Sequence, residues 1–311
     1  MNKLLHWIDQ LTTSPVVGLD IGRGALKVVE LEVSGKKFFL KRALVKSVLP
    51  EENLTDSVKK LLRDSGIATK GVAVGIASPE VTSRIFSFPP MPKKEWHQAI
   101  QLEAEQAILN GHTMAEMAID WHLLGSSSGS LRGLLAVVPK TIIASRSKLV
   151  KEAGLDPLVV DVEGLALWNA YWTLVGSRSS KRGTVLLLNI GFSKTNLVIA
   201  KGPDELILAR DLEIGAQGFA SGRMKDWAEE IVDSLAYARS KSGMRTLDSV
   251  YATGGGSASP EILPLLKSAV TAPVTLWNPF DRLKCGSNRT FLNVPGSMFA
   301  VAIGLALRRL S

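Results

Sequence analysis

The stretch VVGLDIGRGALKVV (residues 16–29) decides the fold of this chain, because the stretch LLLNIGFSKTNLVI (residues 186–199) repeats its pattern. Each copy is an apolar strand, an Asx-Ile-Gly turn and a second apolar strand, a pattern typical of a tight hairpin. The repeat predicts two lobes of one design, each with one such hairpin. The copies differ at a position that matters for chemistry, because the first has Asp20 where the second has Asn189.

The two turns are candidate phosphate-binding sites. An Asx-x-Gly turn exposes backbone N–H groups at a tight bend, and glycine lets a phosphate approach them closely. The carboxylate of Asp20 can hold Mg2+ through a water molecule. One such turn is ordinary hairpin chemistry, whereas one in each lobe favours a nucleotide clamp. The candidate nucleotide-binding residues in the hairpins are Asp20, Gly22, Gly24, Lys27, Asn189, Gly191, Ser193 and Thr195.

A glycine run supplies a third candidate element of the nucleotide site. Strand 249–253 is followed by Gly254, Gly255, Gly256 and Ser257, and a helix is expected to begin near Pro260. Glycines between a strand and a helix let a flat ligand approach the backbone. The run alone is equally typical of a permissive turn, but after two matching hairpins it is the expected wall for an adenosine.

The strand and helix patterns predict two α/β lobes. The basic stretch GSRSSKRG (residues 176–183) is typical of an exposed boundary between them. The expected parts are a first lobe (16–176) with a small inserted subdomain (83–138), a second lobe (183–300), and the end of a C-terminal helix that packs on the first lobe (301–311).

Composition limits the classes of function. The 311 residues are 46% hydrophobic, which suits two cores, and the single Cys285 is expected to be structural in a reducing compartment. The net charge of +8 can attract nucleic acid, acidic partners or anionic lipid. The basic residues are scattered, aromatics make up 6% of the chain, and zinc-ligand spacing is missing, so nucleic acid is not expected. An anionic membrane surface is the favoured use of this charge.

The first residues carry an apolar stripe at helical spacing, formed by Leu4, Trp7, Ile8 and Leu11. We expect this stripe to dock on the body of the protein, with contact to a membrane or a partner as the alternative. The longest apolar run, residues 298–307, is shorter than the roughly 18 residues of a membrane span. It is therefore expected to be a buried helix.

Several motifs, taken in order along nearly the whole chain, resemble the PilM family of type IV pilus assembly proteins. This family belongs to the actin-like ATPases with a ribonuclease H-like fold and is related to FtsA; the pilus protein MshI belongs to the same group. The motifs are GLDIG (18–22), FPPMPKKEW (88–96), IQLEAEQ (100–106), EAGLDPLVVDVEGLAL (152–167), GGGS (254–257) and AIGLAL (302–307).

The resemblance implies a cytoplasmic scaffold, peripheral at the inner membrane, in a type IV pilus or related type II secretion platform. Its partner would be the N-terminal cytoplasmic segment of a PilN-like protein, held in a groove between the main and inserted subdomains. Ile85, Phe86 and Phe88 either line that groove or form strand core. ATP and Mg2+ are the implied cofactors, and self-association stays open.

Glu103 is the candidate catalytic residue. It shares a face of the helix expected at 93–109 with the apolar residues Trp96, Ile100 and Ala107, and a carboxylate there is costly unless it is paired or faces a cleft. In the resembling family this helix passes beneath the phosphates, where Glu103 would orient a water or the metal. The alternative is a capping or salt-bridging glutamate.

Three departures from the family pattern predict weak or lost ATP binding, with at most a weak ATPase activity. Asn189 replaces an aspartate, the first turn has Arg23-Gly24-Ala25 where relatives have small hydroxyl residues, and only residues 214–248 separate the second hairpin from the glycine strand. The second lobe is therefore expected to be reduced. The enzymatic alternative is an ATP-dependent sugar or small-molecule kinase, with Asp161 or Asp120 as its base.

Overall fold

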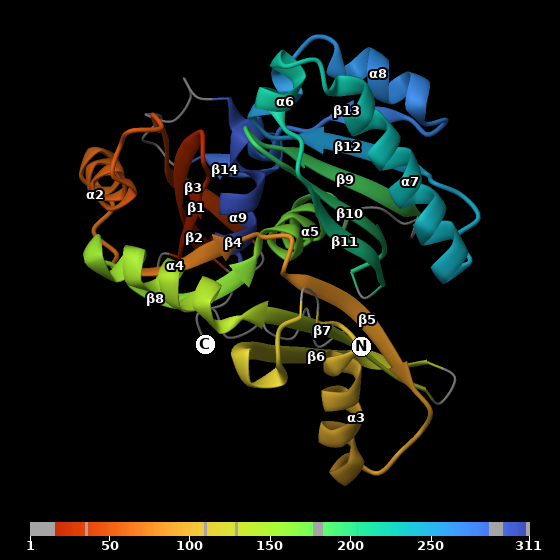
Figure 1. Cartoon of the computed structure of the whole chain (residues 1–311). Coiled ribbons are helices and arrows are strands. Elements are labelled where there is room, and N and C mark those ends of the chain that lie inside the picture. Colours follow the sequence, from red (N-terminus) through yellow and green to blue (C-terminus); the bar gives the residue numbers. More distant parts are fainter. Residues whose placement is uncertain are drawn as a thin grey trace.

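The computed structural model describes residues 16–34, 37–108, 111–127, 130–176, 183–203, 205–285 and 295–308. Two sheets lie on opposite sides of two buried helices, α5 (Glu163–Leu174) and α9 (Ala300–Ala306), which pack against each other (Figure 1). The apolar stripe expected near the N-terminus lies outside the described residues.

The first sheet has the strand order β14-β3-β2-β1-β4-β8. Its strands β1, β4 and β8 run parallel to one another, and β2 lies antiparallel to both β1 and β3. The bounds are β1 (Val16–Ile21), β2 (Ala25–Ser34), β3 (Lys37–Ser47), β4 (Gly71–Ile76), β8 (Asp156–Val162) and β14 (Lys284–Cys285).

The second sheet has the order β13-β12-β9-β10-β11-β5-β7-β6. Strands β9, β12 and β13 are parallel, and the rest of the sheet is antiparallel. The bounds are β5 (Thr82–Phe88), β6 (Met117–Ser127), β7 (Ser130–Pro139), β9 (Thr184–Ile190), β10 (Thr195–Lys201), β11 (Leu206–Leu212), β12 (Ser249–Thr253) and β13 (Val274–Leu276).

The two sheets contain the same five-stranded unit. The order β3-β2-β1-β4-β8 in the first sheet matches β11-β10-β9-β12-β13 in the second, with the same parallel and antiparallel pairings. The hairpins β1–β2 and β9–β10 occupy equivalent places in this unit. The predicted duplication and the two-lobed α/β fold class are therefore confirmed.

Helices cover the outer face of each sheet and leave the inner faces to α5 and α9. Helices α2 and α4 pack on the first sheet, and α7 and α8 pack on the second (Figure 1). Residues of β9 alternate between the two cores, since Leu186 and Leu188 face α7 while Leu187 faces the central helices. The bounds are α2 (Leu54–Ser65), α4 (Lys140–Glu152), α6 (Ala216–Ala220), α7 (Met224–Ser242) and α8 (Ile262–Ala269).

Four short 3-10 helices complete the described helical structure. They are η2 (Met114–Glu116), η4 (Gly255–Ala258), η5 (Pro279–Arg282) and η6 (Gly296–Phe299). The element η4 contains most of the glycine run, residues 254–257, that was predicted from the sequence to lie against the adenosine of a nucleotide.

Helix α9 approaches its neighbours closely because of two glycines. A Cβ on Gly18 of β1 would lie 1.9 Å from the carbonyl oxygen of Ala302, and one on Gly304 would lie 1.8 Å from that of Ala166. The amide of Asn169 on α5 also donates to the carbonyl of Gly304 at 3.0 Å. These contacts fix α9 against both β1 and α5, so the C-terminal helix forms part of the central core.

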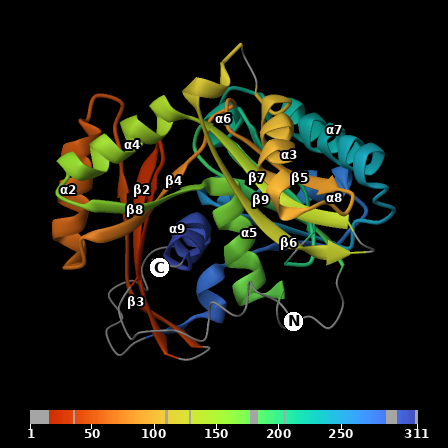
Figure 2. The same cartoon turned by 90° about the horizontal axis from the view of Figure 1, so that it is seen from below.

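The segment expected as an inserted subdomain comprises β5, α3 (Lys93–Glu105), β6 and β7. It lies within the first lobe along the sequence, but its strands continue the second sheet, through the pairing of Ala209 on β11 with Ser83 on β5. Helix α3 packs on one face of these strands (Figure 2). We refer to residues 82–139 below as the small subdomain.

Candidate functional site

The two predicted hairpins place their key polar residues at equivalent positions. Asp20 stands opposite Lys27 in the first hairpin, and Asn189 stands opposite Asn196 in the second. The first pair is ionic, with Lys27 Nζ 3.1 Å from Asp20 Oδ2, and the second is an amide pair, with Asn189 Nδ2 donating to Asn196 Oδ1 at 2.8 Å. The change from Asp to Asn is thus matched by a change from Lys to Asn across the hairpin.

A buried polar cluster connects the two hairpins through the start of α5. Glu163 Oε2 forms an ion pair with Lys194 Nζ of the second hairpin at 3.2 Å and accepts a hydrogen bond from Asn196 Nδ2 at 3.3 Å. The same amide donates to Asp211 on β11 at 2.7 Å. Arg146 on α4 reaches the other side and donates to the carbonyl of Ile21 at 3.2 Å. We call Asp20, Lys27, Arg146, Glu163, Lys194, Asn196 and Asp211 the cleft cluster.

Burial and charge act in opposite directions on the three carboxyl groups of the cleft cluster. Burial raises the pKa of Asp20, despite the attraction of Lys27. Burial also raises the pKa of Asp211, to about 6, although Lys194 opposes the shift. Burial also acts to raise the pKa of Glu163, but the charges of Lys194 and Arg146 together outweigh it, so the pKa of Glu163 is lowered. Glu163 is therefore the carboxylate that the surrounding cations stabilise best.

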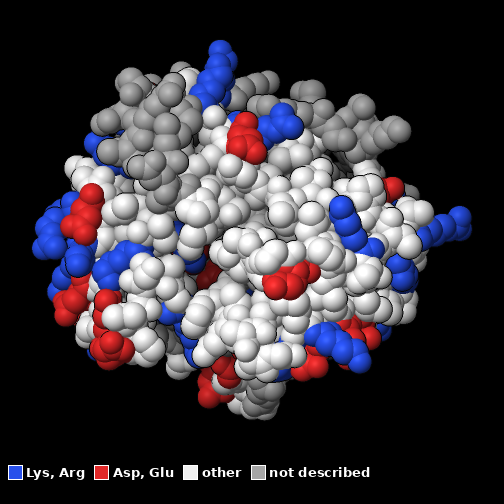
Figure 3. Space-filling view, turned by 90° about the horizontal axis from the view of Figure 1, so that it is seen from above, with Lys and Arg blue, Asp and Glu red and all other residues white. Residues whose placement is uncertain are grey.

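The tips of the hairpins touch each other. Phe192, in the turn of the second hairpin, packs directly on Gly24 of the first, where a Cβ would lie 2.6 Å from the Cβ of Phe192. The face that carries these tips shows only a narrow hollow, with acidic and basic side chains inside it (Figure 3). The phenyl ring thus occupies space beside the first turn that the sequence assigned to a phosphate.

Three of the predicted turn residues, Gly22, Gly191 and Thr195, make hydrogen bonds within the protein. The N–H of Gly22 donates to the carbonyl of Ala25, and that of Gly191 donates to the carbonyl of Lys194. The hydroxyl of Thr195 donates to the carbonyl of Ile214 at 2.8 Å and accepts from Trp227 Nε1 at 3.0 Å. Ser193 is half-buried in the turn.

The glycine run packs on the second hairpin. Gly254 has φ +90, and a Cβ there would lie 2.4 Å from the carbonyl oxygen of Ile190; one on Gly256 would lie 2.5 Å from Cγ2 of the same residue. Gly255 faces Met298, and the hydroxyl of Ser257 donates to the carbonyl of Gly254 at 2.7 Å. The glycines therefore serve close packing between protein segments.

Glu103 lies apart from the cleft cluster. It sits on α3 in the small subdomain, where its carboxylate pairs with Arg84 at 2.7 Å, and Arg84 also donates to its main-chain carbonyl. This geometry agrees with the interpretation of Glu103 as a salt-bridging glutamate. It does not agree with a position of Glu103 beneath the phosphates of a nucleotide. The carboxylate beside the hairpins is Glu163, which follows β8 and begins α5. Its position at the carboxyl end of a parallel strand was the signal that could have identified it.

The three candidate groove residues take different positions. Phe86 is 1% exposed and forms the core between α3 and the strands of the small subdomain. Its interpretation as a groove residue is therefore corrected, because a side chain this buried is not presented to a partner. Phe88 is partly buried and stacks on Phe86, with ring centroids 4.9 Å apart, and Ile85 packs against the central core.

The two candidate kinase bases are also engaged. Asp161 at the end of β8 is buried and pairs with Arg308, whose Nε lies 2.9 Å from its carboxylate. Asp120 is exposed on β6 and accepts from the backbone N–H of Trp121 at 2.9 Å. Neither carboxylate belongs to the cleft cluster.

In this arrangement two of the cleft carboxylates are engaged with cations of the chain. Asp20, the expected metal residue, and Glu163 are each paired with a lysine, and the half-exposed Phe192 packs at Gly24. Within the described ranges, no group of three or more His, Cys, Asp or Glu side chains is placed to hold a metal ion. No helix among those residues is long and apolar enough to cross a membrane.

The duplicated strand order, with paired hairpins and a glycine loop, defines a protein of the actin-like ATPase fold. The chain belongs to the family described as type IV pilus assembly protein PilM, whose model matches residues 18–228 and 220–310. This membership confirms the resemblance found in the sequence. A search of curated proteins gives no match.

Solved structures agree on the fold. A PilM-PilN type IV pilus biogenesis complex superposes with a TM-score of 0.81 at 24% identity, over 96% of this chain and 100% of that chain. A Bacteroides thetaiotaomicron protein with actin-like ATPase fold and unknown function has a TM-score of 0.51 at 12% identity, covering 88% and 93%. The ethanolamine utilization protein EutJ from Carboxydothermus hydrogenoformans has 0.50 at 13%, covering 96% and 90%.

Proposed function

We propose that this chain is a scaffold of a type IV pilus or related type II secretion assembly platform, peripheral at the cytoplasmic face of the inner membrane. Its membership of the PilM family over most of its length carries the proposal. The partner is the N-terminal cytoplasmic segment of a PilN-like protein, by analogy with the solved complex of PilM and PilN. ATP binding is weak or lost, which the lysine-paired carboxylates of the cleft support.

The peptide site of this proposal is the junction between β8 and the small subdomain. Strand β8 is the outer strand of the first sheet, and β6 is the outer strand of the second. The carboxyl group of Asp120 on β6 is within electrostatic range of Asp161 on β8, because its charge adds to the effect of burial in raising the pKa of Asp161. Both edge strands can accept an extended peptide through backbone hydrogen bonds.

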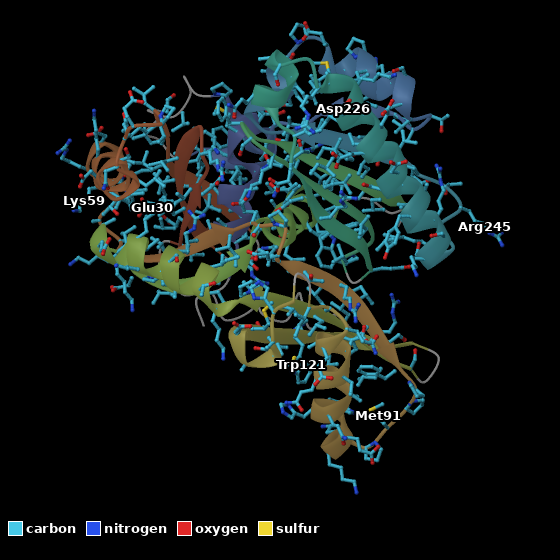
Figure 4. All side chains as sticks on the ribbon, viewed as in Figure 1. Glu30, Lys59, Met91, Trp121, Asp226 and Arg245 are labelled. Atoms are coloured by element: carbon cyan, nitrogen blue, oxygen red, sulfur yellow. The ribbon has the colours of Figure 1, made fainter. Side chains whose placement is uncertain are left out.

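Exposed apolar and acidic side chains suit this junction to a particular peptide. Leu158 on β8 is 57% exposed, and Trp121 on β6, which Figure 4 labels, is 37% exposed. Asp120 and Asp156 are exposed carboxylates on the same two strands. Cytoplasmic segments next to a membrane helix carry an excess of Lys and Arg. A peptide with basic and apolar residues therefore complements the junction.

Calorimetric titration with the N-terminal peptide of a PilN-like protein tests this function. Trp121→Ala and Leu158→Asp are expected to weaken binding about tenfold each, because aromatic anchors carry much of the energy of such interfaces and a buried carboxylate at position 158 would be unfavourable. Tyr237→Ala is the matched control, since Tyr237 is 54% exposed but lies on α7, away from the junction. Equal affinities for all four proteins would contradict the proposed site, and the lack of any peptide binding would contradict the proposed function.

The peripheral location has its own support and test. The net charge of +8 favours a surface of anionic lipid. Flotation with vesicles should recover more protein when anionic lipid is included, and this recovery should fall in high salt. Recovery that does not change with lipid charge would contradict the membrane part of the proposal.

A further inference from the structure

Two of the three carboxyl groups of the cleft cluster are paired with cations of the chain itself. Asp20 is paired with Lys27 inside the first hairpin, and Glu163 is paired with Lys194 from the second. The side chains of Asp20 and Glu163 are 7% and 6% exposed, so each would cost free energy if it were left unpaired. The two lysines supply cationic partners for these carboxylates from within the chain.

Lys194 is the central cation of this arrangement. Its charge acts on Glu163 directly and also lowers the pKa values of Asp20 and Asp211, against the stronger effect of burial. It therefore interacts with carboxyl groups from β1, from α5 and from β11. One side chain in the turn of the second hairpin is thus tied electrostatically to both lobes.

Phe192, two residues before Lys194, makes the apolar counterpart of this contact. Its ring packs on Gly24 in the first hairpin. The backbone of this turn is held by the start of α6. The N–H of Gln217 donates to the carbonyl of Phe192 at 2.8 Å, and the N–H of Ala216 donates to the carbonyl of Gly191 at 3.0 Å. The ring is therefore held at the first hairpin by the start of α6.

We propose that Lys194 and Phe192 hold the two lobes together at the position where a bound nucleotide would do so. The closed arrangement of the hairpins is built into the chain and does not depend on a ligand. Lys194 supplies the positive charge between the lobes, and the half-exposed Phe192 packs against the first turn. This inference rests on the proposed weak or lost ATP binding, and it is independent of the partner peptide.

Hydrogen exchange on the full chain, followed by mass spectrometry with and without Mg-ATP, tests the inference. The amides of the two hairpins should be equally protected in both conditions in the unchanged protein. The double variant Phe192→Ala with Lys194→Met should exchange about tenfold faster or more in both hairpins, while α7 and the small subdomain keep their protection. Protection of the hairpins that appears only with Mg-ATP would overturn the inference, as would a double variant that exchanges like the unchanged protein.

Matched variants separate the proposed clamp from a general loss of structure. Lys225→Met removes the lysine of an exposed Lys–Glu pair on α7, so the hairpins should keep their protection. Lys194→Arg retains the charge and is expected to keep most of the protection that Lys194→Met loses. If the double variant does not fold, the comparison of the unchanged protein with and without Mg-ATP decides the matter. Peptide titration of the same samples reports on the scaffold function separately.

Discussion

Lys194 Nζ lies 3.2 Å from Glu163 Oε2, and this contact joins the turn of the second hairpin to the first residue of the central helix α5. The glutamate is almost fully buried and also accepts from Asn196. Because the pair is internal, the chain satisfies a carboxylate at the heart of an actin-like fold with its own side chain. This ion pair supports the proposal that the chain acts by binding a partner, with weak or lost binding of ATP.

Removal of the Lys194 charge should destabilise the protein. Lys194→Met leaves Glu163 as a buried carboxylate with a weakened set of partners, and breaking a buried pair from one side typically costs about 3–5 kcal/mol. Urea unfolding should show a loss near the lower end of this range, since Arg146 and Asn196 remain. Lys225→Met, at an exposed pair, should change the free energy of unfolding by less than about 1 kcal/mol. Equal effects of the two variants would contradict the importance of the buried pair.

Asp211 should make stability fall as pH rises through weakly acidic values. The native pKa of Asp211, about 6, is above the usual value of 3.8 for an aspartate, so the native state binds the proton more tightly than the unfolded state. The stabilising contribution is complete below about 3.8 and is lost as pH rises through about 6. We expect Asp211→Asn to remove up to about 3 kcal/mol of this pH dependence. The measurement is the free energy of unfolding of the variant and of the parent at several pH values between 4 and 7. A difference that does not change with pH would contradict the shift.

The close approach of α9 to α5 should not tolerate a side chain at Gly304. A Cβ there would lie 1.8 Å from a backbone oxygen, so Gly304→Ala is expected to cost more than about 3 kcal/mol or to prevent folding. Gly164→Ala is the matched control on α5, because its Cβ would meet Val198 at an ordinary 3.6 Å. Thermal unfolding of the control should lie within about 1 kcal/mol of the parent. A stable Gly304→Ala protein would show that the helices do not pack this closely.

Phe86 should behave as a core residue of the small subdomain. Phe86→Ala is expected to cost about 3–5 kcal/mol and to increase hydrogen exchange in α3, because the ring is 1% exposed. The control is Leu102→Ala on α3, where the side chain is 54% exposed. It should change the free energy of unfolding by less than about 0.5 kcal/mol. If Phe86→Ala left α3 protected, the ring would not be the core contact described above.

The duplicated hairpin could be predicted because each copy carries its own turn chemistry and strand pattern. The pairing of Asp20 with Lys27 is likewise local, since the two residues stand opposite each other in one hairpin. The partners of Glu163 are different in kind. They come from β10 and from the turn before it, about 30 residues along the chain, and local pattern does not reveal which carboxylate the folded chain brings there.

The placement of the small subdomain could not be read from the sequence for a similar reason. Its strands pair with one another in the order β5-β7-β6, and one residue pair, Ala209 with Ser83, links them to the rest of the second sheet. Edge strands carry no local signal of the partner strand they choose. The interpretation of Glu103 depended on the same placement. Once α3 lies on the small subdomain, Arg84 is the charge within its reach.

The most direct test of the account is a calorimetric titration of the full chain with the N-terminal peptide of a PilN-like protein, in the absence and presence of Mg-ATP. We expect binding with an affinity that Mg-ATP changes by less than about twofold, because the closed lobes are held by side chains of the protein. Lack of peptide binding, together with ATP consumption that depends on an added sugar, would contradict the account and favour a kinase.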